Sequence, residues 1–121
     1  MLRNKIVYWV FATLLAGAFG FAGFLKVFAN PMEVELFTRF GYPLWFMYVI
    51  GAAELAGALG LICGQFVDTR LPRAAAMGLL VIMTGAIGSH LVYDSLFMML
   101  PAVALSIFLL GFLYTSRPVV V

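Results

Sequence analysis

Three ionisable side chains stand in separate apolar stretches of the chain, where they could carry proton transfer or bind a polar ligand group. They are Lys26, Glu54 and His90. An ionised side chain at the centre of a bilayer costs about 3 kcal/mol on insertion scales, so such groups pair with one another or face a polar cavity. Glu54 or His90 could accept or deliver a proton, and Lys26 could hold an anionic or carbonyl oxygen. These residues therefore predict a polar site inside a membrane protein.

Cysteine and metal chemistry has little support in this sequence. Cys63 is the single cysteine, and no CxxC or Cys/His spacing is present, so a disulfide, a dithiol couple and a zinc site all lack partners. We expect Cys63 to be a buried, inert thiol. A metal held by Glu54, His90 and Asp94 is an alternative, but no motif fixes its geometry. We therefore expect no metal and no intrinsic cofactor.

The composition is that of a membrane protein. Of 121 residues, 65% are hydrophobic and 10% are charged, and the mean hydropathy is +1.13. Soluble domains carry about 25% charged residues. This excludes an ordinary water-soluble enzyme, a nucleic-acid binder and a disordered chain. We expect the lipid bilayer to surround the protein, and we expect no nucleic-acid partner.

Four apolar stretches are long enough to cross the bilayer, since about 20 helical residues span its 30 Å core. We expect helices over about residues 6–29, 44–66, 72–93 and 95–114, in a single transmembrane domain that takes in residues 1–121. The predicted fold class is all-α, an antiparallel four-helix bundle. The first stretch exceeds the usual signal-peptide core, and Lys26 follows it instead of a cleavage motif, so we expect it to be retained.

A short helix is predicted between the first and second spans. Asn30 is suited to the N-cap, Pro31 to the first helical position and Glu33 to a capping box, while Gly41 and Pro43 stop the helix. It is too short and too charged to span the bilayer. We expect it to lie along the membrane surface.

The basic residues predict the orientation of the spans. Five of them fall on one side, namely Arg3, Lys5, Arg70, Arg73 and Arg117, against Arg39 and Lys26 on the other. The positive-inside rule then places both termini in the cytoplasm. We expect a multi-pass protein of the cell (inner) membrane.

Helix geometry brings two of the charged groups together. Glu54 lies about 15 Å below the outer face, and Lys26 and His90 lie about one turn below it. Side chains lean toward the N-terminus of their helix, so Lys26 and Glu54, on antiparallel helices, lean toward each other. Small or apolar residues share their helix faces. The predicted polar site comprises Lys26, Glu54, His90, Asp94, Gly23, Gly57, Met83 and Ala86.

A Gly-Ala-x-Gly pattern occurs three times, at residues 17–20, 57–60 and 85–88. In lipid, small residues let helix backbones approach closely. We interpret the pattern as bundle packing and expect all three copies to lie at helix contacts.

The chain resembles the DoxX-like family of small four-helix membrane proteins. Three patches carry the resemblance, at residues 23–27, 54–61 and 83–90. It implies a four-helix bundle with Lys26, Glu54 and His90 as the polar positions of the family. It also implies mixed functions: some members resemble subunits of membrane thiosulfate:quinone oxidoreductases, others are linked to oxidative-stress complexes, and eukaryotic relatives act as receptor-assembly chaperones. The lack of a cysteine pair or haem-type ligand set argues against autonomous redox catalysis.

Two functions follow from these residues. In the first, an accessory subunit binds a quinone or a lipid in an outward-facing pocket at the polar site. In the second, a non-catalytic assembly factor docks other membrane proteins through small-residue helix faces, and the polar cluster only sets helix register. A transporter or channel is a third reading, for which one four-helix unit offers little room. Another membrane protein or a homo-oligomer is the predicted partner.

Overall fold

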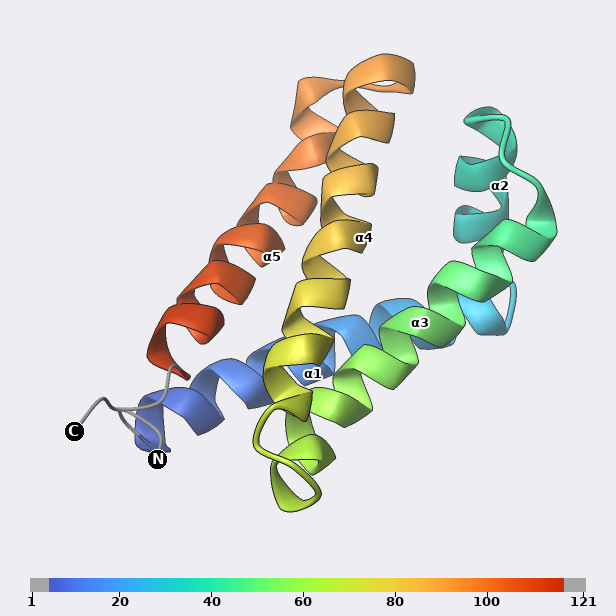
Figure 1. Ribbon diagram of the computed structural model, residues 1–121. Helices are drawn as coiled ribbons and strands as arrows, with labels where there is room; N and C mark the ends of the chain where they lie inside the picture. Colours follow the sequence, from blue (N-terminus) through green and yellow to red (C-terminus); the bar gives the residue numbers. More distant parts are fainter. Residues whose placement is uncertain (1–4, 117–121) are drawn as a thin grey trace.

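The computed structural model describes residues 5–116, which fold into an all-α bundle without strands. Four long helices run back and forth, and a nine-residue helix follows the first of them (Figure 1). In chain order the elements are α1 (Lys5–Val27), α2 (Pro31–Arg39), α3 (Leu44–Cys63) with its extension η1 (Gly64–Phe66), α4 (Leu71–Tyr93) and α5 (Leu96–Thr115).

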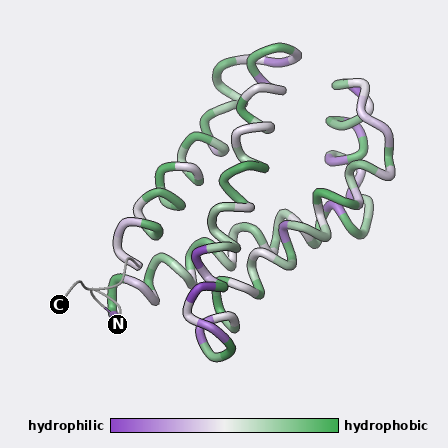
Figure 2. Tube along the Cα trace, viewed as in Figure 1, coloured by the Kyte–Doolittle hydropathy of each residue, from purple (hydrophilic) through white to green (hydrophobic). Residues whose placement is uncertain are grey.

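The four long helices have the length and composition of membrane spans. Each candidate span is 20 to 23 residues long, counting α3 and η1 together. Figure 2 shows apolar residues along their length, with polar residues concentrated in α2 and in the loop before α4. Large apolar side chains such as Ile6, Val81 and Phe97 are more than 70% exposed, which water would penalise and lipid would not. The chain is therefore a multi-pass membrane protein.

The bundle consists of two helix pairs. α1 packs along α3, α4 packs along α5, and α3 contacts α4. Leu15, Phe19, Leu61, Leu79 and Leu109 fill the core where the pairs meet. Figure 1 shows the pairs set at an angle, close together near the chain termini and farther apart toward α2.

Two glycines set the spacing between α1 and α3. A Cβ atom on Gly23 would lie 2.7 Å from the carbonyl oxygen of Gly51, and one on Gly51 would lie 2.7 Å from Cβ of Lys26. Real Cβ atoms do not approach other atoms so closely. The crossing therefore requires glycine on both helices, as expected for close helix packing in lipid.

The Gly-Ala-x-Gly pattern marks a close contact in only one of its three copies. A Cβ atom on Gly57 would lie 2.7 Å from the side chain of Leu79, and one on Gly60 would lie 2.8 Å from Cβ of Ala75. Cβ atoms on Gly17, Gly85 or Gly88 would have no neighbour within 4 Å. The expectation is wrong for these three glycines, because they point away from the neighbouring helices.

The turn between α1 and α2 differs from the prediction. α1 ends at Val27 because Ala29 adopts the left-handed conformation, with φ of 54°, and the Asn30 N–H donates to the carbonyl of Leu25 at 2.9 Å. The Asn30 side chain caps α2 by accepting from the Met32 N–H at 3.0 Å, as predicted. The predicted capping box is wrong, because the Asn30 N–H donates to Leu25 and the Glu33 side chain contacts Lys26 instead.

The other helix ends follow their sequence signals. Gly41, with φ of 82°, ends α2, and the Tyr42 N–H donates back to the Phe37 carbonyl at 2.9 Å. Ser95 caps α5 by accepting from the Met98 N–H at 3.2 Å.

The buried position expected for Cys63 is wrong, since this last residue of α3 is exposed on the outside of the bundle.

Candidate functional site

The close crossing of α1 and α3 brings together a lysine and a glutamate. Nζ of Lys26 lies 3.0 Å from Oε1 of Glu54. Glu54 is 1% exposed, and the Lys26 side chain is 12% exposed. The approach predicted from helix direction is confirmed, and it depends on Gly23 and Gly51 at the crossing.

A second carboxylate joins this pair. Lys26 Nζ donates a hydrogen bond to Oε1 of Glu33, in the first turn of α2, at 3.3 Å. The tight α1–α2 turn folds α2 back far enough for this contact. Sequence reasoning missed Glu33 because the capping box gave it another role; its only signal was its position just after a helix turn. We call Lys26, Glu33 and Glu54 the Lys26 cluster.

One oxygen of the buried Glu54 carboxylate forms an ion pair but no well-directed hydrogen bond within residues 5–116. Its Oε1 atom is buried and accepts none from any residue between 5 and 116. The Lys26 ammonium is close enough for an ion pair but lies outside the directions of a good hydrogen bond. Buried polar atoms are nearly always hydrogen-bonded, and an unmatched one costs free energy. Glu54 is therefore a buried acid that the Lys26 ammonium holds without a well-directed hydrogen bond at Oε1.

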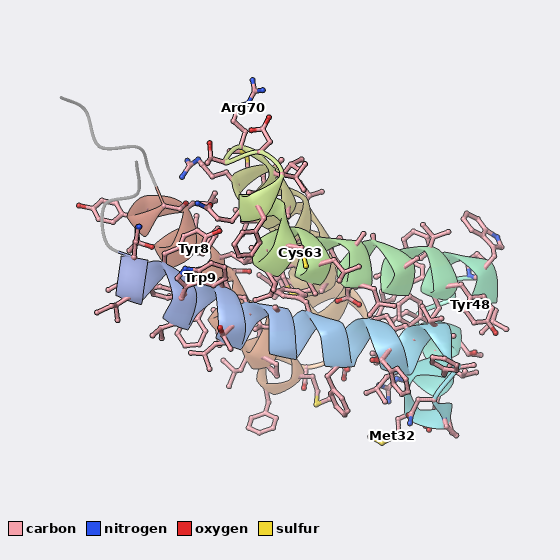
Figure 3. The ribbon with its side chains drawn as sticks, turned by 90° about the horizontal axis from the view of Figure 1, so that it is seen from below. Tyr8, Trp9, Met32, Tyr48, Cys63 and Arg70 are labelled. Carbon is pink, nitrogen blue, oxygen red and sulfur yellow. The ribbon has the colours of Figure 1, made fainter. Side chains whose placement is uncertain are left out.

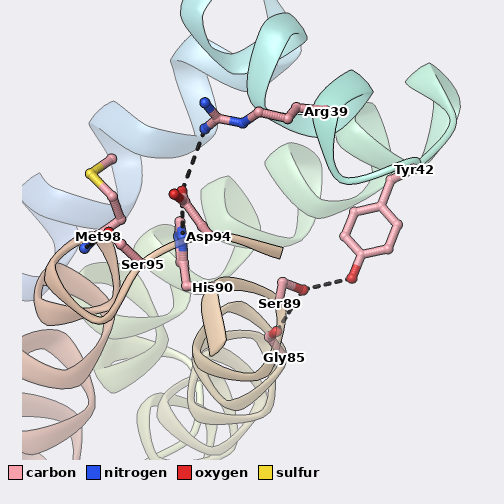
Figure 4. A network of polar contacts seen from close by, with 8 residues as sticks. All are labelled: Arg39, Tyr42, Gly85, Ser89, His90, Asp94, Ser95 and Met98. Carbon is pink, nitrogen blue, oxygen red and sulfur yellow. Dashed lines mark hydrogen bonds and ion pairs between the residues drawn. The ribbon is translucent and has the colours of Figure 1, made fainter. Parts of the chain in front are cut away.

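His90 belongs to a different cluster. Its Nδ1 lies 3.3 Å from Oδ2 of Asp94, and Nη2 of Arg39 lies 3.4 Å from the same oxygen (Figure 4). Within the part of the chain that is described, no hydrogen bond or ion pair links His90 to Lys26 or Glu54. The angle between the helix pairs carries this end of α4 away from α1 and α3. We call Arg39, His90 and Asp94 the Asp94 cluster.

Helix α2 and the loop after it connect the two helix pairs. Glu33 at its start contacts α1, while Arg39 at its end contacts Asp94 beyond α4. The Tyr42 hydroxyl and Ser89 Oγ are 2.6 Å apart, and the rings of Phe40 and His90 meet edge to face at 5.3 Å. No local pattern indicates the Tyr42–Ser89 contact, because these residues lie 47 positions apart. The short helix and its following loop thus bridge the two pairs at this end of the bundle.

The remaining predicted site residues serve packing. Gly57 contacts Leu79, Met83 is buried in the core, and Ala86 packs against that core. Across residues 5–116, no three His, Cys, Asp or Glu side chains gather as a metal-binding group would require. The alternative metal site at Glu54, His90 and Asp94 is thus not assembled.

An open apolar groove of about 650 Å³ runs between α3 and α4. Small residues such as Ala53, Ala56, Gly60, Ala74 and Gly78 line much of it. Neither charged cluster contributes to its lining. The groove faces outward from the bundle, where lipid or another helix would meet it.

The fold and the charged clusters define a small all-α membrane protein with ionisable groups between its spans. A sequence model of the DoxX-like family matches residues 10–112, and the chain belongs to this family. It is 40% identical over 73 residues to the uncharacterized protein YdgD of Bacillus subtilis (strain 168), which covers 57% of this chain and 60% of that relative. The match thus spans less than two thirds of the relative. No solved structure matches the chain.

Proposed function

We propose that this protein is an accessory membrane subunit that binds a lipophilic ligand, a quinone or a lipid. The polar head of the ligand lies at the Lys26 cluster, and its tail lies between the helices. The protein carries no intrinsic cofactor. Ligand pockets of this kind combine apolar walls with a few placed polar groups.

The proposal rests on the burial of Glu54 and on the hydrogen bonding of its carboxylate. A cluster that served only to fix helix register would be most stable if every buried polar atom were hydrogen-bonded. Glu54 is 1% exposed, and its Oε1 accepts no hydrogen bond within residues 5–116. A hydroxyl, as on a reduced quinone, or a lipid amine would add a well-directed donor beside the Lys26 ammonium, and Glu54 could exchange a proton with it.

The same end of the molecule supports an outward opening. The basic residues favour cytoplasmic termini in the cell (inner) membrane, which puts α2 at the outer surface. Figure 3 views the molecule with Met32 and Tyr48 at one end and Tyr8 and Arg70 toward the other. His90, in the Asp94 cluster, then lies at the same end of the molecule but outside the Lys26 cluster.

Native mass spectrometry in lipid patches, with extraction of bound lipophiles, tests this proposal. The Glu54→Gln variant should lose a stoichiometric lipophile that the wild type retains. Glu35→Gln is the matched control, because Glu35 is exposed on α2 and outside the cluster. Equal occupancy in wild type and Glu54→Gln, at equal folded yield, would contradict the proposal.

The apolar groove favours a second candidate, an assembly factor that docks a helix of another membrane protein or a second copy. Gly78 lines the groove, and a Cβ there would meet no atom within 4 Å. Gly78→Leu should therefore fill the groove without disturbing the fold and should abolish recovery of a crosslinked membrane partner. Gly85→Leu, on the same helix outside the groove, is the control. Unchanged recovery would exclude docking at this groove.

A further inference from the structure

We infer that the head group this site prefers is a primary ammonium on an apolar chain, in preference to an anionic head. The inference rests on the proposed function and narrows its ligand class. It follows from the charge and the hydrogen-bonding capacity of the Lys26 cluster.

The cluster carries more negative than positive charge. One ammonium, on Lys26, lies 3.0 Å from Glu54 and 3.3 Å from Glu33. With all three groups ionised, the formal charge is −1. An ammonium head brings the total to zero, whereas an anionic head raises it to −2.

Burial strengthens the effect of this excess negative charge. The side chains of Lys26, Glu33 and Glu54 are 12%, 18% and 2% exposed, so little water screens them. Interactions between charges strengthen as the local dielectric constant falls. An unbalanced carboxylate here therefore attracts a cation more strongly than one at an open surface would.

Hydrogen bonding leads to the same preference. A lysine ammonium has three donors, and that of Lys26 faces two carboxylates. It has little capacity left for the acceptor oxygens of an anionic head. Glu54 Oε1, by contrast, forms an ion pair with Lys26 but accepts no well-directed hydrogen bond among residues 5–116. A primary ammonium would bring three N–H groups to an oxygen that needs one.

The partial exposure of Lys26 and Glu33 gives the route of entry. Both lie beside the α1–α2 turn, and Glu54 lies deeper in the α1–α3 crossing. A head group entering past the turn would meet Glu33 first and Glu54 second. Glu33 therefore contributes to charge selection without being part of the α1–α3 contact.

Three probes with the same chain test the inference: dodecylammonium, dodecanol and dodecyl sulfonate. Their dissociation constants are measured by calorimetry with the protein in bilayer discs of phosphatidylcholine. We expect dodecylammonium to bind about tenfold more tightly than dodecyl sulfonate, with dodecanol between them. Glu33→Gln and Glu54→Gln should each remove most of this difference, because each brings the cluster charge to zero.

Glu35→Gln is the matched control, since it removes one negative charge from the same short helix outside the cluster. This variant should keep the wild-type ratio between the dissociation constants of dodecyl sulfonate and dodecylammonium. Glu33→Gln keeps the inference testable if Glu54→Gln folds poorly, because Glu33 lies at the edge of the cluster.

The outcomes separate the inference from the proposed function. Equal or tighter binding of dodecyl sulfonate, lost in Glu54→Gln, would overturn the ammonium preference and leave the ligand site in place. If Glu54→Gln and Glu33→Gln alter the affinity of no probe, both the preference and the proposed site are wrong.

Discussion

Two ion pairs at the α2 end of this protein contain the same kinds of charge but differ in burial. In the Lys26–Glu54 pair the side chains are 12% and 2% exposed, and in the Arg39–Asp94 pair they are 52% and 17% exposed. The first forms where two helices cross at paired glycines. The second connects a surface helix to a turn. The comparison shows that helix spacing, and not charge type, decides which pair is buried and which stays exposed.

The difference has an energetic consequence. Removing one member of a buried ion pair leaves an uncompensated charge away from water, whereas an exposed charge regains its hydration. Substitutions of similar size should therefore have very different effects in the two clusters.

The largest effect is expected for Lys26→Met, which leaves Glu54 buried without its counter-charge. The free energy of unfolding should fall by about 3–5 kcal/mol. Arg39→Gln, the comparison variant in the Asp94 cluster, should cost about 0–1 kcal/mol. Unfolding in mixed detergent micelles measures both. Similar losses for the two variants would show that burial does not separate the clusters.

A smaller loss is expected when the helix crossing itself is widened. Gly51→Ala places a Cβ where Cβ of Lys26 lies 2.7 Å away, so α1 and α3 must shift apart. Overpacking of this kind costs about 1–3 kcal/mol. It should also weaken Lys26–Glu54 contact and reduce ligand occupancy.

Gly17→Ala is the control for this substitution, because its Cβ would meet no atom within 4 Å. It should be neutral or slightly stabilising, since alanine favours helix over glycine. If Gly51→Ala were equally neutral in the same unfolding assay, the crossing would not determine the geometry of the pair.

The smallest effect is expected at the other end of the molecule, in the loop before α4. Arg70 donates to Asp68 at 2.9 Å, with side chains 89% and 39% exposed, and these hydrogen bonds lower the pKa of Asp68 from 3.8 to about 2. The contribution of the Asp68–Arg70 pair to the free energy of unfolding is therefore present above pH 3.8, and it disappears as the pH falls through 2. Asp68→Asn should leave the unfolding midpoint at pH 7 unchanged.

Carboxyl NMR titration of Asp68 checks this last prediction directly. An ordinary pKa near 3.8 would show that the contact with Arg70 does not persist in solution. A large loss of stability in Asp68→Asn at pH 7 would contradict the relation between exposure and energetic effect.

Helix ends show how far local sequence signals reach. Asn30, Pro31, Gly41 and Ser95 fulfil the roles that their types predict, because capping depends on a few neighbouring backbone groups. The end of α1 was placed two residues late, at 29 instead of Val27. The reason is that Ala29, a residue type that rarely adopts positive φ, does so here.

The sequence by itself determined the spans and the approach of Lys26 to Glu54. Span length and composition reflect the cost of placing polar groups in lipid, and the approach follows from the lean of side chains on antiparallel helices. Both are properties of single helices and their direction, so they can be read from spacing along the chain.

Only the tertiary structure determined which charged groups belong to the Lys26 cluster and which to the Asp94 cluster. It placed Glu33 beside Lys26, kept His90 apart from Lys26 and Glu54, brought Arg39 to Asp94, and left Gly85 and Gly88 with no atom within 4 Å of an added Cβ. These outcomes depend on the angle between two helix pairs and on one tight turn. Such features arise from packing among residues far apart in sequence, and no local spacing encodes them.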